Sequence, residues 1–475
     1  MAGLREKIFR DSVHGYVHVP EDWCARFIDT DIFQRLRQIE QTSMRCLYPS
    51  AHHDRFVHSL GVYHLGRKAF GHLLRNSQDL VEGMGVSDEE KQLWQASFHA
   101  ACLLHDCAHS PFSHTFEEHY DRGGRLDARL ADAAKDDCDF ERDLQDASPP
   151  APHEKASSFL VLTRFSDDIR SVGGDPCLTA RMILGCTYRG RADRPSLFKN
   201  ALISLLNSRA IDVDKLDYIT RDTWASGVHN TSVDIERLLA AVTVVEVANG
   251  SQMRIAFRKT ALSVLQGVVD ARNYLYEWIY GHHKVQYSQE LLKRAVERLG
   301  DLLGTGSLEK IFSIEALIGP VDVGGFTLHL PTDGDIVFLL KTHLRKLPEA
   351  EEWLSRKYRR KALWKTYLEF KQWFPDTPDG DLGKMGARLK KNKRLDEWWR
   401  SQGYGDQPLV LDVKVKLYEM LHNDLLISVS PGTTVSFDKA FSRVVQRDPG
   451  LFYLYTPVGV EVDKVALKKF LHQAV

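Results

Sequence analysis

The apolar residues of this chain recur mostly at the three- and four-residue spacing of α-helices. In residues 23–39, for example, that spacing relates Phe33, Leu36 and Ile39. A last helix should begin after Asp463, whose side chain can cap its first turn. The apolar spacing also predicts helices over residues 58–74, 88–105, 261–299 and 349–374.

Shorter stretches carry the patterns of β-strands. Residues 7–20 are expected to be extended around His14 and Gly15. The dipeptide Asn249-Gly250, which favours a tight hairpin turn, separates two apolar stretches within residues 241–257. Residues 409–417 alternate between apolar and polar side chains, as in a half-buried strand. The sequence therefore predicts a mainly α protein with a short β-hairpin and an α+β C-terminal lobe.

The same patterns suggest how the chain is divided. We expect a helical core over residues 1–300 and a C-terminal lobe over residues 301–475, which would serve oligomerisation or regulation. Within the core, residues 120–152 contain Gly123-Gly124 and several prolines, a composition that favours an exposed, flexible insertion. Pro152 then fits the first turn of the next helix.

Composition and charge narrow the location and the partners. The net charge of -1 gives no general attraction to nucleic acid or to membranes. Seven cysteines without a CxxC spacing indicate reduced thiols rather than a disulfide framework. Residues 1–7 lack the apolar core of a signal peptide, and no apolar run approaches transmembrane length. We therefore expect a cytoplasmic protein.

The candidate chemistry begins at His105-Asp106, which end an almost wholly apolar run of residues 94–104. Burying an imidazole and a carboxylate is costly unless a partner compensates, and these two groups suit a divalent transition metal. A capped helix end with a surface hydrogen bond is the alternative. Two further segments could converge on the same ion, one with His58 and one within residues 211–222. Charge alone leaves three aspartates of the latter open: Asp212, Asp214 and Asp217.

These segments, in this order, resemble the HD-domain dNTP triphosphohydrolases, the family of bacterial dGTPases and of the human enzyme with a sterile-alpha-motif module. The resemblance covers about residues 4–290 and rests on Phe33–Arg37, His105-Asp106, Pro111–His114 and Asp212–Lys215. It implies an HD-type helical catalytic core with a divalent metal ion, and leaves Mn, Mg, Fe, Zn and Ni open. The metal ligands it implies are His58, His105, Asp106 and Asp214.

The implied reaction converts a dNTP and water to a deoxynucleoside and inorganic triphosphate. It requires attack of water at phosphorus and protonation of the leaving oxygen. His109 follows His105 by four residues, so both lie on one face of a continued helix, and histidine titrates near neutrality, which suits His109 to donate that proton. His114 and His153 are further candidates. The resemblance implies that His109 and His153 are the catalytic pair and that His114 contacts phosphate. Alternatively, these histidines only cap and cross-link helices.

The resemblance also assigns the substrate contacts. Around the triphosphate, where cations are needed, it implies Arg55, Lys215 and Arg272. Around the deoxyribose it implies Gln41, Tyr218, Asp222 and Tyr280, and a tyrosine ring against C2 would exclude ribonucleotides. The sequence departs from the vertebrate pattern at Tyr276 and Gly281, and the spacing from Gln41 to His58 is one residue shorter. The base preference therefore stays open.

A second nucleotide site is implied by Lys7, Asp29, Gln34 and Arg37, which match positions that hold an activating guanine nucleotide between subunits. An aspartate can accept hydrogen bonds from guanine N1 and N2, while Arg or Gln addresses O6. We therefore expect activation by GTP, dGTP or another dNTP, and a homo-oligomer with a tetramer favoured. The alternative is that Gln34 and Arg37 form only the polar face of a helix.

Two other functions stay open. An HD-type phosphodiesterase or nuclease could act on cyclic nucleotides or single-stranded nucleic acid, with the basic, aromatic residues 353–364 as a binding track. Such a stretch is more often a solvated helix face, and here it could bind an allosteric dNTP. A non-catalytic nucleotide sensor is the second alternative, which the intact set of metal ligands disfavours. The sequence does not choose between dNTP pool balance and defence against viruses or phage.

Overall fold

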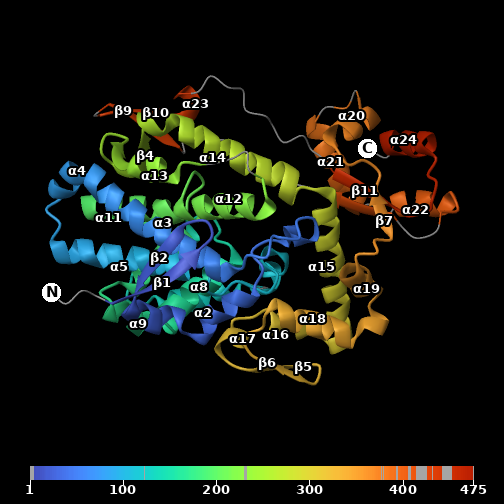
Figure 1. The fold of residues 1–475 in the computed structure, drawn as a ribbon, viewed down its shortest axis with the longest axis horizontal. Coiled ribbons are helices and arrows are strands. Elements are labelled where there is room, and N and C mark those ends of the chain that lie inside the picture. Colours follow the sequence, from blue (N-terminus) through green and yellow to red (C-terminus); the bar gives the residue numbers. More distant parts are fainter. Residues whose placement is uncertain are drawn as a thin grey trace.

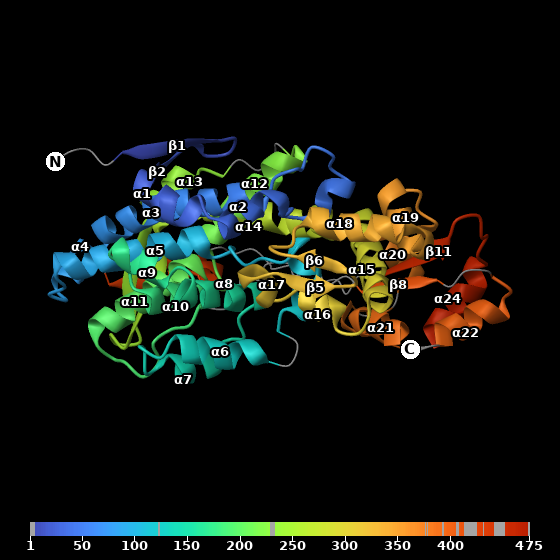
Figure 2. The ribbon, with the colours of Figure 1, turned by 90° about the horizontal axis from the view of Figure 1, so that it is seen from below.

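The structure is a computed structural model that describes residues 5–121, 124–228, 233–375, 377, 379–391, 394–404, 408–412, 425–430, 432–440 and 452–473. Helices dominate these residues, and the strands form small sheets, so the prediction of a mainly α protein is confirmed. Figures 1 and 2 show a large helical core on one side of α15 (His283–Leu303) and most of the C-terminal elements on its other side.

The helical core is built around α5 (Asp88–Leu104), which is almost fully buried from Trp94 onward. This helix packs against α3 (Arg55–Asn76) and α10 (Pro176–Leu184). Gly66 permits the close approach of α3, since a Cβ there would lie 2.5 Å from Cys102 Sγ. The predicted helices over 58–74 and 88–105 are thus confirmed. Further helices of the core include α4 (Gln78–Glu82), α8 (Pro152–Thr163), α9 (Ser166–Ser171), α11 (Arg194–Leu206), α12 (Val213–Ser226) and α13 (Ile235–Ala240).

The N-terminal segment is a β-hairpin followed by a broken helix. Strands β1 (Glu6–Asp11) and β2 (Gly15–Pro20) pair antiparallel, which confirms the extended element around His14. The helix predicted over residues 23–39 is interrupted at Thr30, whose side chain accepts a hydrogen bond from Phe33 N and starts a new helix. The pieces are α1 (Glu21–Trp23), a π-helical turn (Cys24–Ile28), α2 (Asp31–Arg35) and a 3-10 turn (Leu36–Gln38).

Residues 125–145 belong to the packed core, so the expectation of an excursion outside it is wrong. They form α6 (Arg125–Ala133) and α7 (Phe140–Gln145), and their buried apolar side chains include Leu126, Leu130, Phe140 and Leu144. Arg181 Nη1 lies 3.0 Å from Asp143 Oδ2, and Arg181 Nε lies 2.7 Å from Asp137 Oδ2. These buried ion pairs compensate the charges of Asp137, Asp143 and Arg181 within the core. Helix α8 then begins at Pro152, as predicted.

The predicted hairpin around Asn249-Gly250 is also confirmed. Its strands are β3 (Val242–Val247) and β4 (Gln252–Arg258), and Asn249 and Gly250 both have positive φ. Strand β4 pairs in parallel with β9 (Leu426–Ser430), which gives the sheet order β10-β9-β4-β3 with β10 (Thr433–Ser436) at the edge. Part of the C-terminal sequence, including α23 (Phe437–Ala440), therefore returns to the helical core, as Figure 1 shows.

The long helix predicted over residues 261–299 is divided at Gly281. Helix α14 (Leu262–Tyr274) continues as a π-helical turn (Leu275–Tyr280), and the His282 side chain then caps α15 by accepting from Lys284 N. The next elements are α16 (Ser307–Ile311), α17 (Glu315–Ile318), β5 (Val321–Val323), β6 (Phe326–Leu328) and α18 (Asp333–Thr342).

A single helix over residues 349–374 is a wrong prediction. Helix α19 (Pro348–Ser355) ends at Arg356, which has a φ of 56°, and a strand separates it from the next helix. That strand, β7 (Arg360–Ala362), belongs to a sheet of order β7-β11-β8 with β11 (Phe452–Pro457) and β8 (Leu409–Asp412). The remaining helices here are α20 (Tyr367–Trp373), α21 (Asp379–Lys391), α22 (Arg394–Ser401) and α24 (Lys464–Gln473).

These elements form the α+β C-terminal lobe that the sequence predicts. The Asp463 side chain accepts from Val465 N at 2.9 Å, as expected for the cap of α24. Of the strand predicted over 409–417, residues 413–417 lie outside the described residues. The lobe has its own aromatic core, which also includes Tyr287 of α15. Buried apolar residues within 311–350 belong instead to the hydrophobic core around α5. The division at residue 300 stays a prediction. No helix in the described ranges is both long and apolar enough to cross a bilayer.

Candidate active site

Three segments far apart in the sequence bring the four predicted metal ligands together. His58 Nε2 lies 3.3 Å from His105 Nε2 and 3.1 Å from Asp214 Oδ1. Asp106 Oδ2 lies 3.6 Å from each of these two nitrogen atoms. The side chains of His58, His105 and Asp214 form a group whose geometry could hold a metal ion, with Asp106 beside it.

The ends of two helices position the histidines of this group. Asp54 caps α3 by accepting from Val57 N at 3.0 Å, so His58 lies in the first turn of that helix. His105 follows the last residue of α5, whose apolar surface buries this end of the helix. The cost of burying His105 and Asp106 is therefore set by the packing of the whole helix, and the neighbouring groups must compensate it.

The three candidate aspartates of the third segment have different partners. Asp212 caps α12 by accepting from Lys215 N at 2.8 Å and pairs with Lys215 Nζ at 2.6 Å. Asp217 Oδ2 lies 2.7 Å from His58 Nδ1, on the far side of the ring. Asp214 alone of the three faces His58 Nε2. In the first turns of α12, Asp212 therefore caps the helix, Asp214 is the candidate metal ligand, and Asp217 contacts the other side of His58.

The chemistry of the donor set fits a divalent metal ion. The acceptors Asp217 Oδ2 and the Cys102 carbonyl lie 2.7 and 3.0 Å from Nδ1 of His58 and His105, which assigns the ring protons to Nδ1. The Nε2 lone pairs then face each other, an arrangement that a cation stabilises. Burial lowers the pKa of His58, but Asp214 and Asp217 outweigh burial and raise it to about 9, so the site attracts positive charge.

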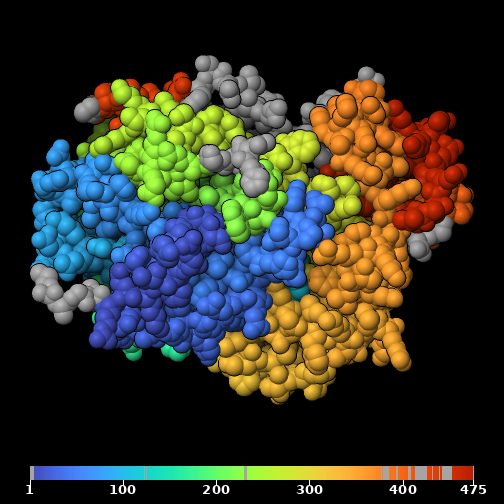
Figure 3. All heavy atoms as spheres, viewed as in Figure 1, coloured from blue at the N-terminus to red at the C-terminus, as the bar shows by residue number. Residues whose placement is uncertain are grey.

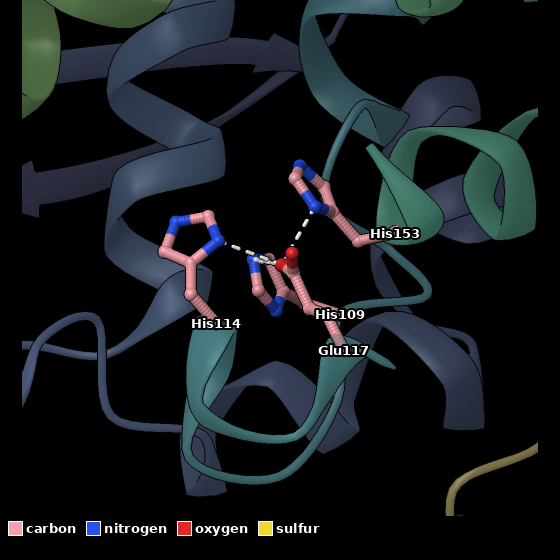
Figure 4. A group of neighbouring side chains, drawn as sticks. All are labelled: His109, His114, Glu117 and His153. Carbon is pink, nitrogen blue, oxygen red and sulfur yellow. Dashed lines mark hydrogen bonds and ion pairs between the residues drawn. The ribbon is translucent and has the colours of Figure 1, made fainter. Parts of the chain in front are cut away.

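A second cluster surrounds the carboxylate of Glu117 (Figure 4). His114 Nδ1 and His153 Nδ1 each lie 2.7 Å from Glu117 Oε1, and His109 Nε2 lies 3.3 Å from the same atom. The rings of His109 and His153 stack with their centroids 4.3 Å apart. His153 Nε2 lies 3.8 Å from Asp106 Oδ1, which brings the two clusters into contact. The second cluster also has a geometry that could hold a metal ion.

Sequence patterns alone do not single out Glu117. One signal was available, since Glu117 follows His114 by three residues, a spacing that places two side chains on one side of a helical turn. The position of Glu117 also depends on the backbone before it. Phe112 and Ser113 have φ of 56° and 53°, which is rare for residues other than glycine. This turn directs the chain back, so that His114 and Glu117 face His109.

The charge states within this cluster differ. Burial lowers the pKa of His153, but the Glu117 carboxylate outweighs burial and raises it to about 9. Burial, with Arg55 and His153 nearby, holds the pKa of His109 well below its usual range. Burial raises the pKa of Glu117, but His153 and His114 hold it well below the ordinary value. Near neutral pH the cluster therefore contains a protonated His153, a neutral His109 and an ionised Glu117.

The basic residues predicted around the triphosphate differ in their surroundings. Arg55 Nη1 lies 2.5 Å from Asp106 Oδ2, directly beside the candidate metal ligands. Lys215 Nζ is bound at 2.8 Å by the carbonyl of Ser208 and at 2.6 Å by Asp212. Both cations thus have a carboxylate partner, but the partner of Arg55 is the candidate metal ligand Asp106, whereas the partner of Lys215 is the capping residue Asp212.

The residues predicted around the sugar form a connected group. The Tyr280 hydroxyl donates to Asp222, which also lies 2.7 Å from His53 Nε2. Burial raises the pKa of Tyr218, and Tyr276 and Asp214 raise it further whereas Arg272 lowers it, so this group is linked electrostatically to the metal ligand Asp214. The Arg272 guanidinium lies over the Tyr276 ring at 4.0 Å from its centroid. Gln41 has a buried Oε1 without a hydrogen-bond partner among the described residues.

The four predicted regulatory residues lie at the surface in two adjoining pairs. Lys7 Nζ lies 2.6 Å from Asp29 Oδ2, and Arg37 Nε donates to Gln34 Oε1 at 2.8 Å. Gln34 Nε2 also donates to the carbonyl of Ile28, the residue before Asp29. The hairpin and the broken helix that follows it therefore present these side chains together, and their role in binding a nucleotide stays a prediction.

Comparison with known proteins identifies curated relatives, although no protein-family model matches the chain. Deoxynucleoside triphosphate triphosphohydrolase SAMHD1 of Homo sapiens is 28% identical over 443 residues, 87% of this chain and 61% of its own length. The protein of the same name from Gallus gallus is 28% identical over 369 residues, 76% and 55% of the two chains. A Bacillus subtilis relative, uncharacterized protein YwfO, is 28% identical over 304 residues, 63% and 58%. The chain spans 55 to 61% of the length of these three relatives, and they confirm the resemblance to the HD-domain dNTP triphosphohydrolases.

Proposed function

We propose that this relative of the HD-domain dNTP triphosphohydrolases converts a dNTP and water to a deoxynucleoside and inorganic triphosphate. The observation that carries the proposal is the contact between the candidate metal ligands and the Glu117 cluster, where His153 Nε2 lies 3.8 Å from Asp106 Oδ1. A site that attracts a metal cation, next to a proton donor, suits hydrolysis of a phosphate ester. The names of the human and chicken relatives support the substrate class.

His58, His105, Asp106 and Asp214 would hold the metal ion. A divalent ion bound there would act as a Lewis acid on the phosphate and would activate the attacking water. Arg55 would contribute a second, permanent positive charge, because its guanidinium is buried against Asp106. Mn, Mg, Fe, Zn and Ni remain candidates, since imidazole and carboxylate do not select among them.

His153 is suited to protonate the leaving 5′ oxygen. Its pKa of about 9 keeps it protonated at neutral pH, and its Nδ1 forms an ion pair with Glu117 at 2.7 Å, so the Nε2–H is available for transfer. The sequence suggested His109 as the proton donor, but burial with Arg55 and His153 nearby lowers its pKa, so the neutral His109 is better suited to accept the proton that the attacking water loses. As the bond between the α-phosphorus and O5′ breaks, the sugar oxygen takes the proton of His153. His114, with 66% of its side chain exposed, is open to a phosphate group.

The remaining side chains of the site would bind the substrate. Arg55, Lys215 and Arg272 would surround the triphosphate, and Gln41, Tyr218, Asp222 and Tyr280 the deoxyribose. The unpartnered Oε1 of Gln41 supports this assignment, because a sugar hydroxyl can donate to it. The hydrogen bond from the Tyr280 hydroxyl to Asp222 would hold the tyrosine ring in place beside the sugar.

Regulation and assembly form the finer part of the proposal. Lys7, Asp29, Gln34 and Arg37 would bind an activating GTP, dGTP or other dNTP in a cytoplasmic homo-oligomer, for which a tetramer is favoured. The adjoining ion pair and hydrogen bond of these residues support a shared ligand. The C-terminal lobe, divided from the core at residue 300, would serve oligomerisation or regulation.

Product analysis tests the reaction. Purified protein loaded with each metal in turn is incubated with dNTPs, rNTPs, cyclic nucleotides and single-stranded DNA, and the products are separated by chromatography. We expect a deoxynucleoside and intact triphosphate from dNTPs alone. A monophosphate with pyrophosphate, or a diphosphate with phosphate, would contradict the proposal. Cleavage of DNA or cyclic nucleotide would favour a phosphodiesterase or nuclease, and dNTP binding without turnover would favour a nucleotide sensor.

A further inference from the structure

The tip of the N-terminal hairpin reaches the candidate metal ligands. The hairpin, dark blue in Figure 3, lies on the outer surface, yet the His14 side chain is only 6% exposed. His14 Nε2 lies 2.6 Å from Asp217 Oδ1, and Asp217 Oδ2 lies 2.7 Å from His58 Nδ1. One fully buried carboxylate thus joins the hairpin to a histidine whose other nitrogen faces His105 and Asp214.

Arg221 holds this carboxylate and the hairpin together. Its Nε and Nη2 donate to Asp217 at 2.9 and 3.0 Å, and its Nη1 donates to Asp11 Oδ2 at 2.9 Å. Asp11 Oδ1 in turn accepts from the backbone N of His14 at 2.8 Å. The turn is therefore fixed both by its backbone and by its side chain, and each oxygen of Asp217 accepts two hydrogen bonds, one of them from a histidine.

The packing around Asp217 leaves little room for another arrangement. A Cβ at Gly61 would lie 1.9 Å from Asp217 Oδ1, so only glycine fits at this position of α3. The ring of His14 stacks on His64 with the centroids 5.6 Å apart. Gly61 and His64 lie on α3 with His58, three and six residues after it, so this helix forms one wall of the whole network.

We propose that His14 is a positioning residue for the metal centre, which acts on His58 through Asp217. By donating to Oδ1, His14 fixes the carboxylate that orients the His58 ring and keeps the Nε2 lone pair directed at the ion. The inference rests on the proposed function in one respect, that His58 is a metal ligand. Residues that orient a ligand in this way typically change metal affinity by about 10- to 100-fold when removed.

Two substitutions at this position separate a hydrogen-bonding role from a packing role. His14→Phe keeps a ring against His64 but removes the donor, whereas His14→Gln keeps a donor close to the place of Nε2. His18→Phe is the matched control, since His18 lies on the same hairpin and its side chain contacts Glu6 at 3.1 Å. Metal affinity is measured on metal-free protein by competition with a chromophoric chelator for Mn²⁺ and Zn²⁺, and the melting temperature of each metal-free variant is recorded.

We expect His14→Phe to weaken metal binding about 10- to 100-fold, with His14→Gln and His18→Phe close to wild type. Equal affinity of His14→Phe and wild type would overturn the inference. An equal loss in His14→Phe and His14→Gln that follows their melting temperatures would overturn it too, because packing alone would then explain the loss. These affinities need no turnover, so a wild type that binds metal but hydrolyses no dNTP would refute the proposed function and leave this result standing.

Discussion

Replacement of Glu117 by glutamine should move the alkaline limit of hydrolysis to lower pH. Glutamine keeps the shape of the side chain and can still accept from His153 Nδ1, which lies 2.7 Å away, but it carries no charge. That charge is a main reason why the pKa of His153 is raised from 6.5 to about 9 despite burial. A reaction that requires protonated His153 proceeds below this pKa and is lost as the pH rises through it, so the loss should come earlier in the variant.

The size of the effect follows from the two pKa values. With a pKa of about 9, His153 is about 90% protonated at pH 8, whereas at the ordinary histidine pKa of 6.5 it would be about 3% protonated, and burial without the carboxylate lowers the pKa further. Glu117→Gln should therefore be at least about 30-fold slower than wild type at pH 8. At pH 6, which is closer to the pKa of His153 in the variant, the difference should be much smaller.

The assay is the initial rate of triphosphate release between pH 5.5 and 9.5, at saturating metal and dNTP. Glu118→Gln is the control, since the neighbouring Glu118 pairs with Lys293 at 2.8 Å. An equal loss at pH 6 and pH 8 would show that Glu117 does not act through the charge of His153. A fall in bound metal in Glu117→Gln would instead indicate that the second cluster itself holds an ion.

Two further substitutions test the metal ligands and the regulatory residues. Asp106→Asn should abolish hydrolysis and metal binding at this site while the helical content persists; elemental analysis and circular dichroism check this, and full retention of metal would contradict the assignment. Asp29→Ala should weaken a guanine activator by about 1–3 kcal/mol, so that about ten- to hundredfold more GTP or dGTP is needed with little change in maximal rate. Activator titrations with light scattering measure this, and a wild type that is equally fast and unchanged in mass without guanine nucleotide would contradict the regulatory role.

Local chemistry in the sequence determined the main helices and one hairpin. The run that ends at His105-Asp106 is apolar on all sides, so α5 must be buried wherever the rest of the chain lies, and its polar end must find partners there. The Asn249-Gly250 turn is similarly local, because positive φ at both positions selects these residues. The expectation that His58 and Asp214 join His105-Asp106 came instead from the resemblance to a family, since spacing and charge left Asp212 and Asp217 equally open.

Only the tertiary structure decided which polar side chains meet. His14 and Asp217 are 203 positions apart in the sequence, and His53 and Asp222 are 169 apart, so neither contact has a local pattern that could predict it. Glu117 reaches the histidines because the backbone turns through positive φ at Phe112, a conformation that the residue type disfavours and that the surrounding packing must hold in place. Periodicity specifies which face of a helix is buried, whereas the partner of a buried charge depends on which other segment packs against that face.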